Sequence, residues 1–168
     1  MTAEAPLFHT LDRLRSLRLF GLLLISLIGG QWLLIALFLL IPCEACRASS
    51  PLEHMHTLAD LLYGVAIGPL LESIILYAAI KLLSRLTRRI SIHCLVFGVF
   101  FGGLHAVTDG SVRWLITGFA FALYTAAYFI YQRRYRWPLI PMTALHAVNN
   151  LVAASPLLIA LMRHDGSQ

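Results

Sequence analysis

The stretch GPLLESIILY, residues 68–77, places one carboxylate, Glu72, in the middle of a run of side chains that otherwise suits lipid. An ionised acid that faces lipid is costly, so acidic residues at membrane depth usually face the interior of a helical bundle or a water-filled cavity, where they pair or do chemistry. Glu72 therefore predicts a bundle of helices that surrounds it and a pairing or chemical role for its carboxylate.

The composition predicts that the whole chain is a membrane protein. Of its 168 residues, 59% are hydrophobic and 12% are charged, and the mean hydropathy is +0.78, whereas soluble domains are about half apolar and a quarter charged. The apolar runs are long enough to cross a hydrocarbon core, which takes about 20 helical residues. We predict an all-α, polytopic transmembrane helical bundle, with residues 1–168 in a single membrane domain. Five spans are expected, at approximately residues 19–41, 57–83, 90–107, 112–131 and 139–162.

The basic residues predict the orientation of the bundle. With five spans, the N-terminal segment and the loops after the second and fourth spans share one side, which collects ten of the 13 Lys and Arg residues. Because Lys and Arg are retained on the cytoplasmic face, we predict a multi-pass protein of the cell membrane with its N-terminus in the cytoplasm and its C-terminus outside. These flanks, facing the headgroups of the lipid bilayer, explain the net charge of +5, and we predict no nucleic-acid partner.

Two later apolar segments carry further polar side chains, namely His105 in one and His146 and Asn150 in the other. His146 and Asn150 are four residues apart and so share one face of a helix. A carboxylate in an apolar cavity is a better proton acceptor from water, and a histidine beside it can share that water. A second histidine and an asparagine opposite could donate hydrogen bonds to a developing oxyanion. Together these groups suit hydrolysis of an amide without a nucleophilic serine or cysteine.

Pairs of glycines in two of the expected spans predict close helix packing. Gly98 and Gly102 lie on the His105 side of the third span at the small-xxx-small spacing that lets another backbone approach closely. Gly29 and Gly30 in the first span indicate a close contact or a kink.

The order of these residues resembles that of a known family. Glu72, then Phe101-x-x-x-His105, then His146-x-x-x-Asn150 is similar to the pattern of the CPBP or Abi family of prenyl-protein CAAX proteases and bacteriocin-processing and immunity proteins, over about residues 69–151. The resemblance implies a glutamic intramembrane endopeptidase in which Glu72 is the base, His105 is its water-activating partner, and His146 and Asn150 are oxyanion donors. No cofactor is expected. Because chains already in the bilayer reach such a site most easily, the expected substrate is a membrane-anchored or hydrophobic protein or peptide.

The first motif departs from the family pattern at two positions. Ser73 stands where the family has a second glutamate, and Tyr77 stands where it has an arginine. Because an acid and a base are absent together, no orphan buried charge is left, which would be strongly destabilising. The change is therefore interpreted as the replacement of a structural ion pair.

Other functions fit the same residues. Two histidines and a glutamate are a sufficient ligand set for catalytic zinc, which would make Glu72 a ligand and not the base. A noncatalytic membrane protein, such as an immunity factor or a small transporter, could use the polar cluster for binding or proton movement. Taken singly, His146 and Asn150 could form hydrogen bonds that hold helices together, and His105 could hydrogen-bond to Asp109, one helical turn later.

A loop between the first two spans contains a second group of chemically active residues. Cys43 and Cys46 with His54 and His56 have spacing like that of a zinc site. In a loop expected outside the cell, a local disulfide or two free thiols is favoured over a metal.

Overall fold

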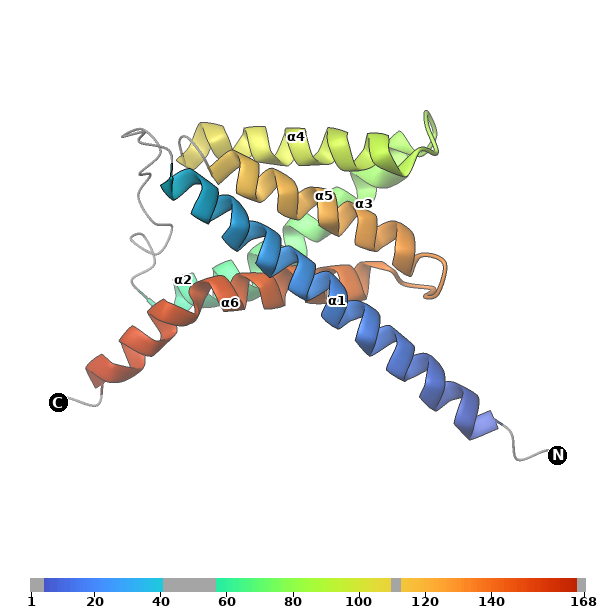
Figure 1. Cartoon of the computed structure of the whole chain (residues 1–168), viewed down its shortest axis with the longest axis horizontal. Helices are drawn as coiled ribbons and strands as arrows, with labels where there is room; N and C mark the ends of the chain where they lie inside the picture. The colour runs from blue at the N-terminus through green and yellow to red at the C-terminus, as the bar shows by residue number, and fades with distance from the viewer. Residues whose placement is uncertain (1–4, 41–56, 110–112, 166–168) are drawn as a thin grey trace.

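The computed structural model describes the backbone of residues 5–40, 57–109 and 113–165, and the side chains of residues 16–37, 40, 57–107 and 114–155. Within these ranges the chain forms helices and turns and no strand, which confirms the all-α prediction. The helices are α1 (Ala5–Leu39), α2 (Leu58–Leu62), the π-helix η3 (Tyr63–Ile67), α3 (Gly68–Leu83), α4 (Ile90–Asp109), α5 (Arg113–Tyr131) and α6 (Leu139–Asp165). Because α2, η3 and α3 follow one another without a break, the described chain has five helical rods (Figure 1).

Four of these rods have the length and apolar composition needed to cross a membrane, judged over the described residues. They are Ser16–Leu37, Leu58–Leu83, Ile90–Val107 and Trp114–Tyr131. The chain is therefore a membrane-embedded helical protein. The side chains of α6 are described only as far as Ser155, so its expected span at 139–162 stays a prediction. The cysteines and histidines of the loop between the first two spans lie outside the described residues.

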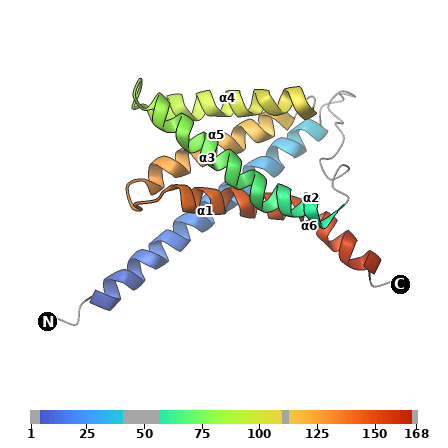
Figure 2. The same ribbon diagram turned by 180° about the vertical axis from the view of Figure 1, so that it is seen from behind.

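The helix α5 lies at the centre of the bundle and contacts α1, α3, α4 and α6. In Figure 1, α4, α5 and α6 form one layer and α1 crosses the near face of that layer. Figure 2 shows α3 crossing the opposite face. Half of the α5 span is buried within the protein, compared with 6% of the α1 span. The helix α1 is therefore peripheral and mostly exposed to the surrounding medium.

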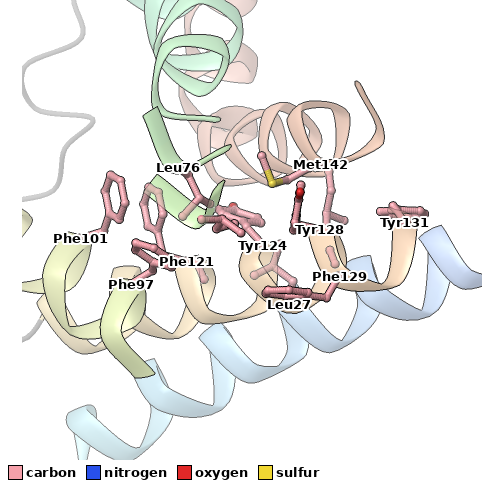
Figure 3. Packing of buried hydrophobic residues seen from close by; sticks show 14 residues of the cluster. Leu27, Leu76, Phe97, Phe101, Phe121, Tyr124, Tyr128, Phe129, Tyr131 and Met142 are labelled. Atoms are coloured by element: carbon pink, nitrogen blue, oxygen red, sulfur yellow. The ribbon is translucent and has the colours of Figure 1, made fainter. Parts of the chain in front are cut away.

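The core follows from the pattern of aromatic residues along α5. Phe121, Tyr124, Tyr128 and Phe129 are all buried and extend along this helix (Figure 3). The neighbouring helices each contribute residues to the same cluster, including Leu27 from α1, Leu76 from α3, Phe97 and Phe101 from α4, and Met142 from α6. The helices on either face of the layer are thus joined through the side chains of α5.

The predicted close approach at Gly98 and Gly102 is confirmed, and its partner is α5. A Cβ atom built on Gly102 would lie 2.5 Å from the Trp114 carbonyl oxygen, and one built on Gly98 would lie 2.9 Å from the Gly118 carbonyl oxygen. In α1, a Cβ on Gly30 would meet the ring of Phe119, whereas Gly29 has nothing within 4 Å. Gly30 therefore makes the close contact that the glycine pair predicted.

The ends of the second rod are tied down by side chains. At its start, Thr57 accepts a hydrogen bond from the Asp60 amide at 3.2 Å while the Asp60 carboxylate accepts one from the Thr57 amide at 3.0 Å, which is a capping box. At its far end, Ser84 lies 3.2 Å from Nε2 of the buried His93, whose Nδ1 donates to the Arg89 carbonyl at 3.0 Å. The two contacts of His93 fix the turn between α3 and α4.

The turns that carry most of the basic residues lie at one end of the molecule. The α3–α4 turn and the α5–α6 turn are at the right of Figure 1, on the same side as the beginning of α1. Their basic side chains are exposed, namely Arg85, Arg88, Arg89, Arg133, Arg134 and Arg136. The gathering of charge at one end fits the pattern used to predict the topology, and the assignment of that end to the cytoplasm stays a prediction.

Candidate active site

Glu72 of α3 contacts the buried His146 of α6. Glu72 Oε2 lies 3.4 Å from His146 Nε2, and 34% of the Glu72 side chain is exposed, compared with 5% for His146. The distance is longer than the 2.7–2.9 Å of a strong charge-assisted hydrogen bond. The carboxylate is therefore adjacent to the imidazole and still open to a third group on its exposed side.

The ring of His146 is held by two aromatic residues of α5. The Tyr124 ring stacks on it with a centroid distance of 4.4 Å and an interplanar angle of 29°, and the Phe121 ring packs edge-on at 5.5 Å. Among the described residues, the buried Nδ1 atom of His146 has no hydrogen-bond partner. A neutral imidazole has one N–H and one acceptor nitrogen. The tautomer that places the proton on Nε2 avoids a buried unpaired N–H and directs that N–H toward Glu72.

His105 of α4 belongs to the same cluster. It lies near enough to interact electrostatically with both Glu72 and His146. Its ring is 6.4 Å from the Phe121 ring, and Phe121 itself stacks on Phe101 at 4.0 Å. Phe121 thus borders both histidines. Glu72, His105 and His146, three of the four residues chosen from the sequence, therefore lie near one another although they are distant in the chain.

Asn150 has a different contact. Its Nδ2 donates a 2.9 Å hydrogen bond to the backbone carbonyl of Gly64, which lies in the π-helix η3. Asn150 and His146 therefore both contact the rod formed by α2, η3 and α3, but at different residues of it. A primary amide has two N–H donors, and this bond uses one of them. The use of Asn150 as an oxyanion donor stays a prediction.

Ser73 and Tyr77, the two positions that differ from the pattern of the family that the sequence resembles, both lie in packed surroundings. Ser73 is buried with 1% exposure. The Tyr77 ring packs edge-on against Tyr128 at 5.7 Å, and Lys81 Nζ lies 5.6 Å from the Tyr77 ring centroid. An aromatic contact therefore stands where an arginine would need a buried acid beside it.

The sequence reasoning missed three residues of the site, all from the apolar parts of the spans. Phe121 and Tyr124 hold the His146 ring, and Asn149 hydrogen-bonds to the Tyr124 side chain. Tyr124 is 1% exposed and Asn149 is 6% exposed. The one signal available was Asn149 beside Asn150, a second amide at membrane depth. Nothing in the sequence distinguishes Phe121 from the other aromatic residues of α5.

The arrangement gives the zinc alternative no geometric support. Among the described residues, no three His, Cys, Asp or Glu side chains are grouped so that they could hold a metal ion. The possible contact between His105 and Asp109 falls outside the described side chains.

Comparison with known proteins adds no further assignment, because no family model, no curated protein and no solved structure matches this chain.

Proposed function

We propose that this protein is an intramembrane endopeptidase of the glutamic type, similar to the CPBP or Abi enzymes, which hydrolyses a peptide bond with water and without a covalent intermediate. The observation that carries the proposal is the contact between Glu72 and His146, with His105 beside them, inside a bundle of apolar helices. Placing these ionisable groups together at membrane depth is costly unless they pair or do chemistry.

The proposed reaction begins with a water bound to Glu72 and His105. Glu72 takes a proton from this water, and the oxygen attacks the peptide carbonyl carbon. The carbonyl oxygen then gains negative charge, and the Nε2–H of His146, which the now protonated Glu72 attracts less strongly than the carboxylate did, donates to it, with the second N–H of Asn150 as the other proposed donor. When the C–N bond breaks, the proton on Glu72 passes to the leaving amine. Base and donor lie 3.4 Å apart, which is close enough for the attacked carbonyl group to contact both.

The proposed substrate is a peptide segment within the bilayer. Glu72 lies about 21 Å from the start of a span that is about 39 Å long, at 1.5 Å per residue over the 26 residues of Leu58–Leu83. The one-third exposure of its side chain gives such a segment a route to the carboxylate. A soluble chain would have to enter the hydrocarbon region first and lose its backbone hydrogen bonds to water.

The test is hydrolysis in H₂¹⁸O. Purified protein in lipid vesicles is incubated with solubilised membrane proteins of the expression host, and new C-termini carrying one ¹⁸O are counted by mass spectrometry. We expect such C-termini with the wild type and their loss with Glu72→Gln. Asp60→Asn is the matched control, because it makes the same change of acid to amide in the same rod, at the capping box. Equal counts for the wild type and Glu72→Gln would contradict the proposal.

Two further arms separate the alternatives. Loss of cleavage with a chelator and its return with added zinc would favour the metal enzyme. Proton flux across the vesicle membrane that depends on Glu72, without any ¹⁸O-labelled product, would favour the transporter.

A further inference from the structure

The backbone carbonyl of Gly64 lacks a donor within its own helix. In a regular α-helix it would accept from the N–H of Gly68, but in the π-helix η3 that N–H donates to the carbonyl of Tyr63. At the π-helical spacing of five residues, the donor to the Gly64 carbonyl would be the N–H of residue 69. That residue is Pro69, which has no N–H. In the hydrocarbon region water is absent, so a carbonyl of this kind needs a partner from elsewhere in the protein.

Asn150 supplies that partner from a different rod. Its amide donates to the Gly64 carbonyl at 2.9 Å, and α6 lies against η3 (Figure 2). The same substitution of a side chain for a missing N–H occurs at a second proline. Ser155 Oγ donates at 2.8 Å to the carbonyl of Val152. In a regular α-helix this carbonyl would accept from the N–H of residue 156, which is Pro156 and has none.

The π-helix matters for Glu72 because it sets the rotation of everything after it. Each residue turns an α-helix by about 100°, so the extra residue of a π-helical turn changes the face on which Glu72 lies by about that angle. Two polar contacts then join the second rod to α6, at Gly64 with Asn150 and at Glu72 with His146. Loss of the first removes the hydrogen bond between the π-helical turn and α6.

We propose that Asn150 is a positioning residue that replaces the N–H missing at Pro69, and so keeps the π-helical turn and holds Glu72 against His146. A catalytic role for this placement of Glu72 rests on the proposed hydrolysis. The experiments below read only stability and the state of His146, so a failure of this inference is distinguishable from a failure of the proposed function.

The first experiment is a double-mutant cycle of thermal unfolding in bicelles. Asn150→Leu removes the donor and leaves the Gly64 carbonyl unpaired, so the melting temperature should fall by about 2–6 °C. Pro69→Ala restores a backbone N–H next to that carbonyl, and in this background Asn150→Leu should cost less than half as much. If Asn150→Leu alone does not fold, the double variant Pro69→Ala/Asn150→Leu should fold. An equal loss in both backgrounds, or a folding defect that Pro69→Ala does not repair, would overturn the proposal.

The second experiment distinguishes positioning of Glu72 from a general loss of stability. The ¹⁵N resonances of His146, assigned with His146→Gln, should shift in Glu72→Gln because the carboxylate beside Nε2 is neutralised. Asn150→Leu should shift them in the same direction. Ser84→Ala, which removes a contact of His93 at the far end of the rod, should lower stability and leave these resonances unchanged. Unchanged His146 resonances in Asn150→Leu would refute the positioning role.

Discussion

The contact between α4 and α5 is so close that adding one methyl group should separate the two helices. A Cβ atom at Gly102 would lie 2.5 Å from the Trp114 carbonyl oxygen, whereas ordinary contact begins at 3.4 Å, so the helices must move apart by about 0.9 Å (3.4 − 2.5). The atom it meets belongs to the backbone and cannot rotate away. Gly102→Ala should therefore cost about 1–3 kcal/mol of overpacking, offset by up to about 1 kcal/mol of helix propensity.

The neighbouring glycine provides a matched control for this variant. Gly103 lies in the same helix and has nothing within 4 Å of its built Cβ, so Gly103→Ala should be neutral or stabilising by about 1 kcal/mol. Unfolding in detergent, followed by helical circular dichroism, should place the midpoint of Gly102→Ala below the wild type and that of Gly103→Ala at or above it. His105 is carried by the same helix, so cleavage should also fall in Gly102→Ala. Equal stability of the two variants would refute the close packing of α4 on α5.

Three further substitutions test other contacts. Phe121→Leu removes the ring that borders both histidines, and should destabilise by about 1 kcal/mol while reducing ¹⁸O-labelled product far more than that loss explains; unchanged cleavage would mean that the ring does not hold the site. Ser84→Ala should destabilise by about 1 kcal/mol because Nε2 of the buried His93 loses its partner, and a midpoint equal to that of the wild type would contradict this. Gly30→Ala should lower the unfolding midpoint because its Cβ would meet the Phe119 ring, whereas Gly29→Ala should not; the reverse order would contradict the packing of α1 on α5.

The helices could be predicted from the sequence because the membrane restricts the choices. Backbone groups in lipid must be satisfied internally, so each apolar run between charged stretches indicates a helix. The start of α1 was not predicted, because residues 5–18 are polar and form a helical extension that precedes the apolar run. The central place of α5 was not predictable, because its apolar residues do not differ in kind from those of α1. Both helices suit lipid, and only packing decides which of them is surrounded by protein.

The polar residues at membrane depth identified the cluster for a similar reason. The cost of placing Glu72, His105 and His146 at membrane depth made each of them conspicuous, and the structure brings them together. The partner of Asn150 was not predictable. It depends on a π-helical turn that lies against α6, and nothing in the sequence indicates where the helix takes this wider turn. Pro69 was visible in the sequence, but the carbonyl that it leaves unpaired depends on that same register.

The neighbourhood of Ser73 explains how this site can contain one carboxylate and not two. Residue 73 is buried with 1% exposure, so an acid there would be enclosed and would need a cation such as an arginine one turn later. Breaking such a pair from one side costs about 3–5 kcal/mol, whereas replacing both partners with packed neutral groups is often neutral or stabilising. Tyr77 packs against Tyr128 in the place of that cation. With neutral residues at both positions, the second rod is held here by packing, and Glu72 remains in contact with His146.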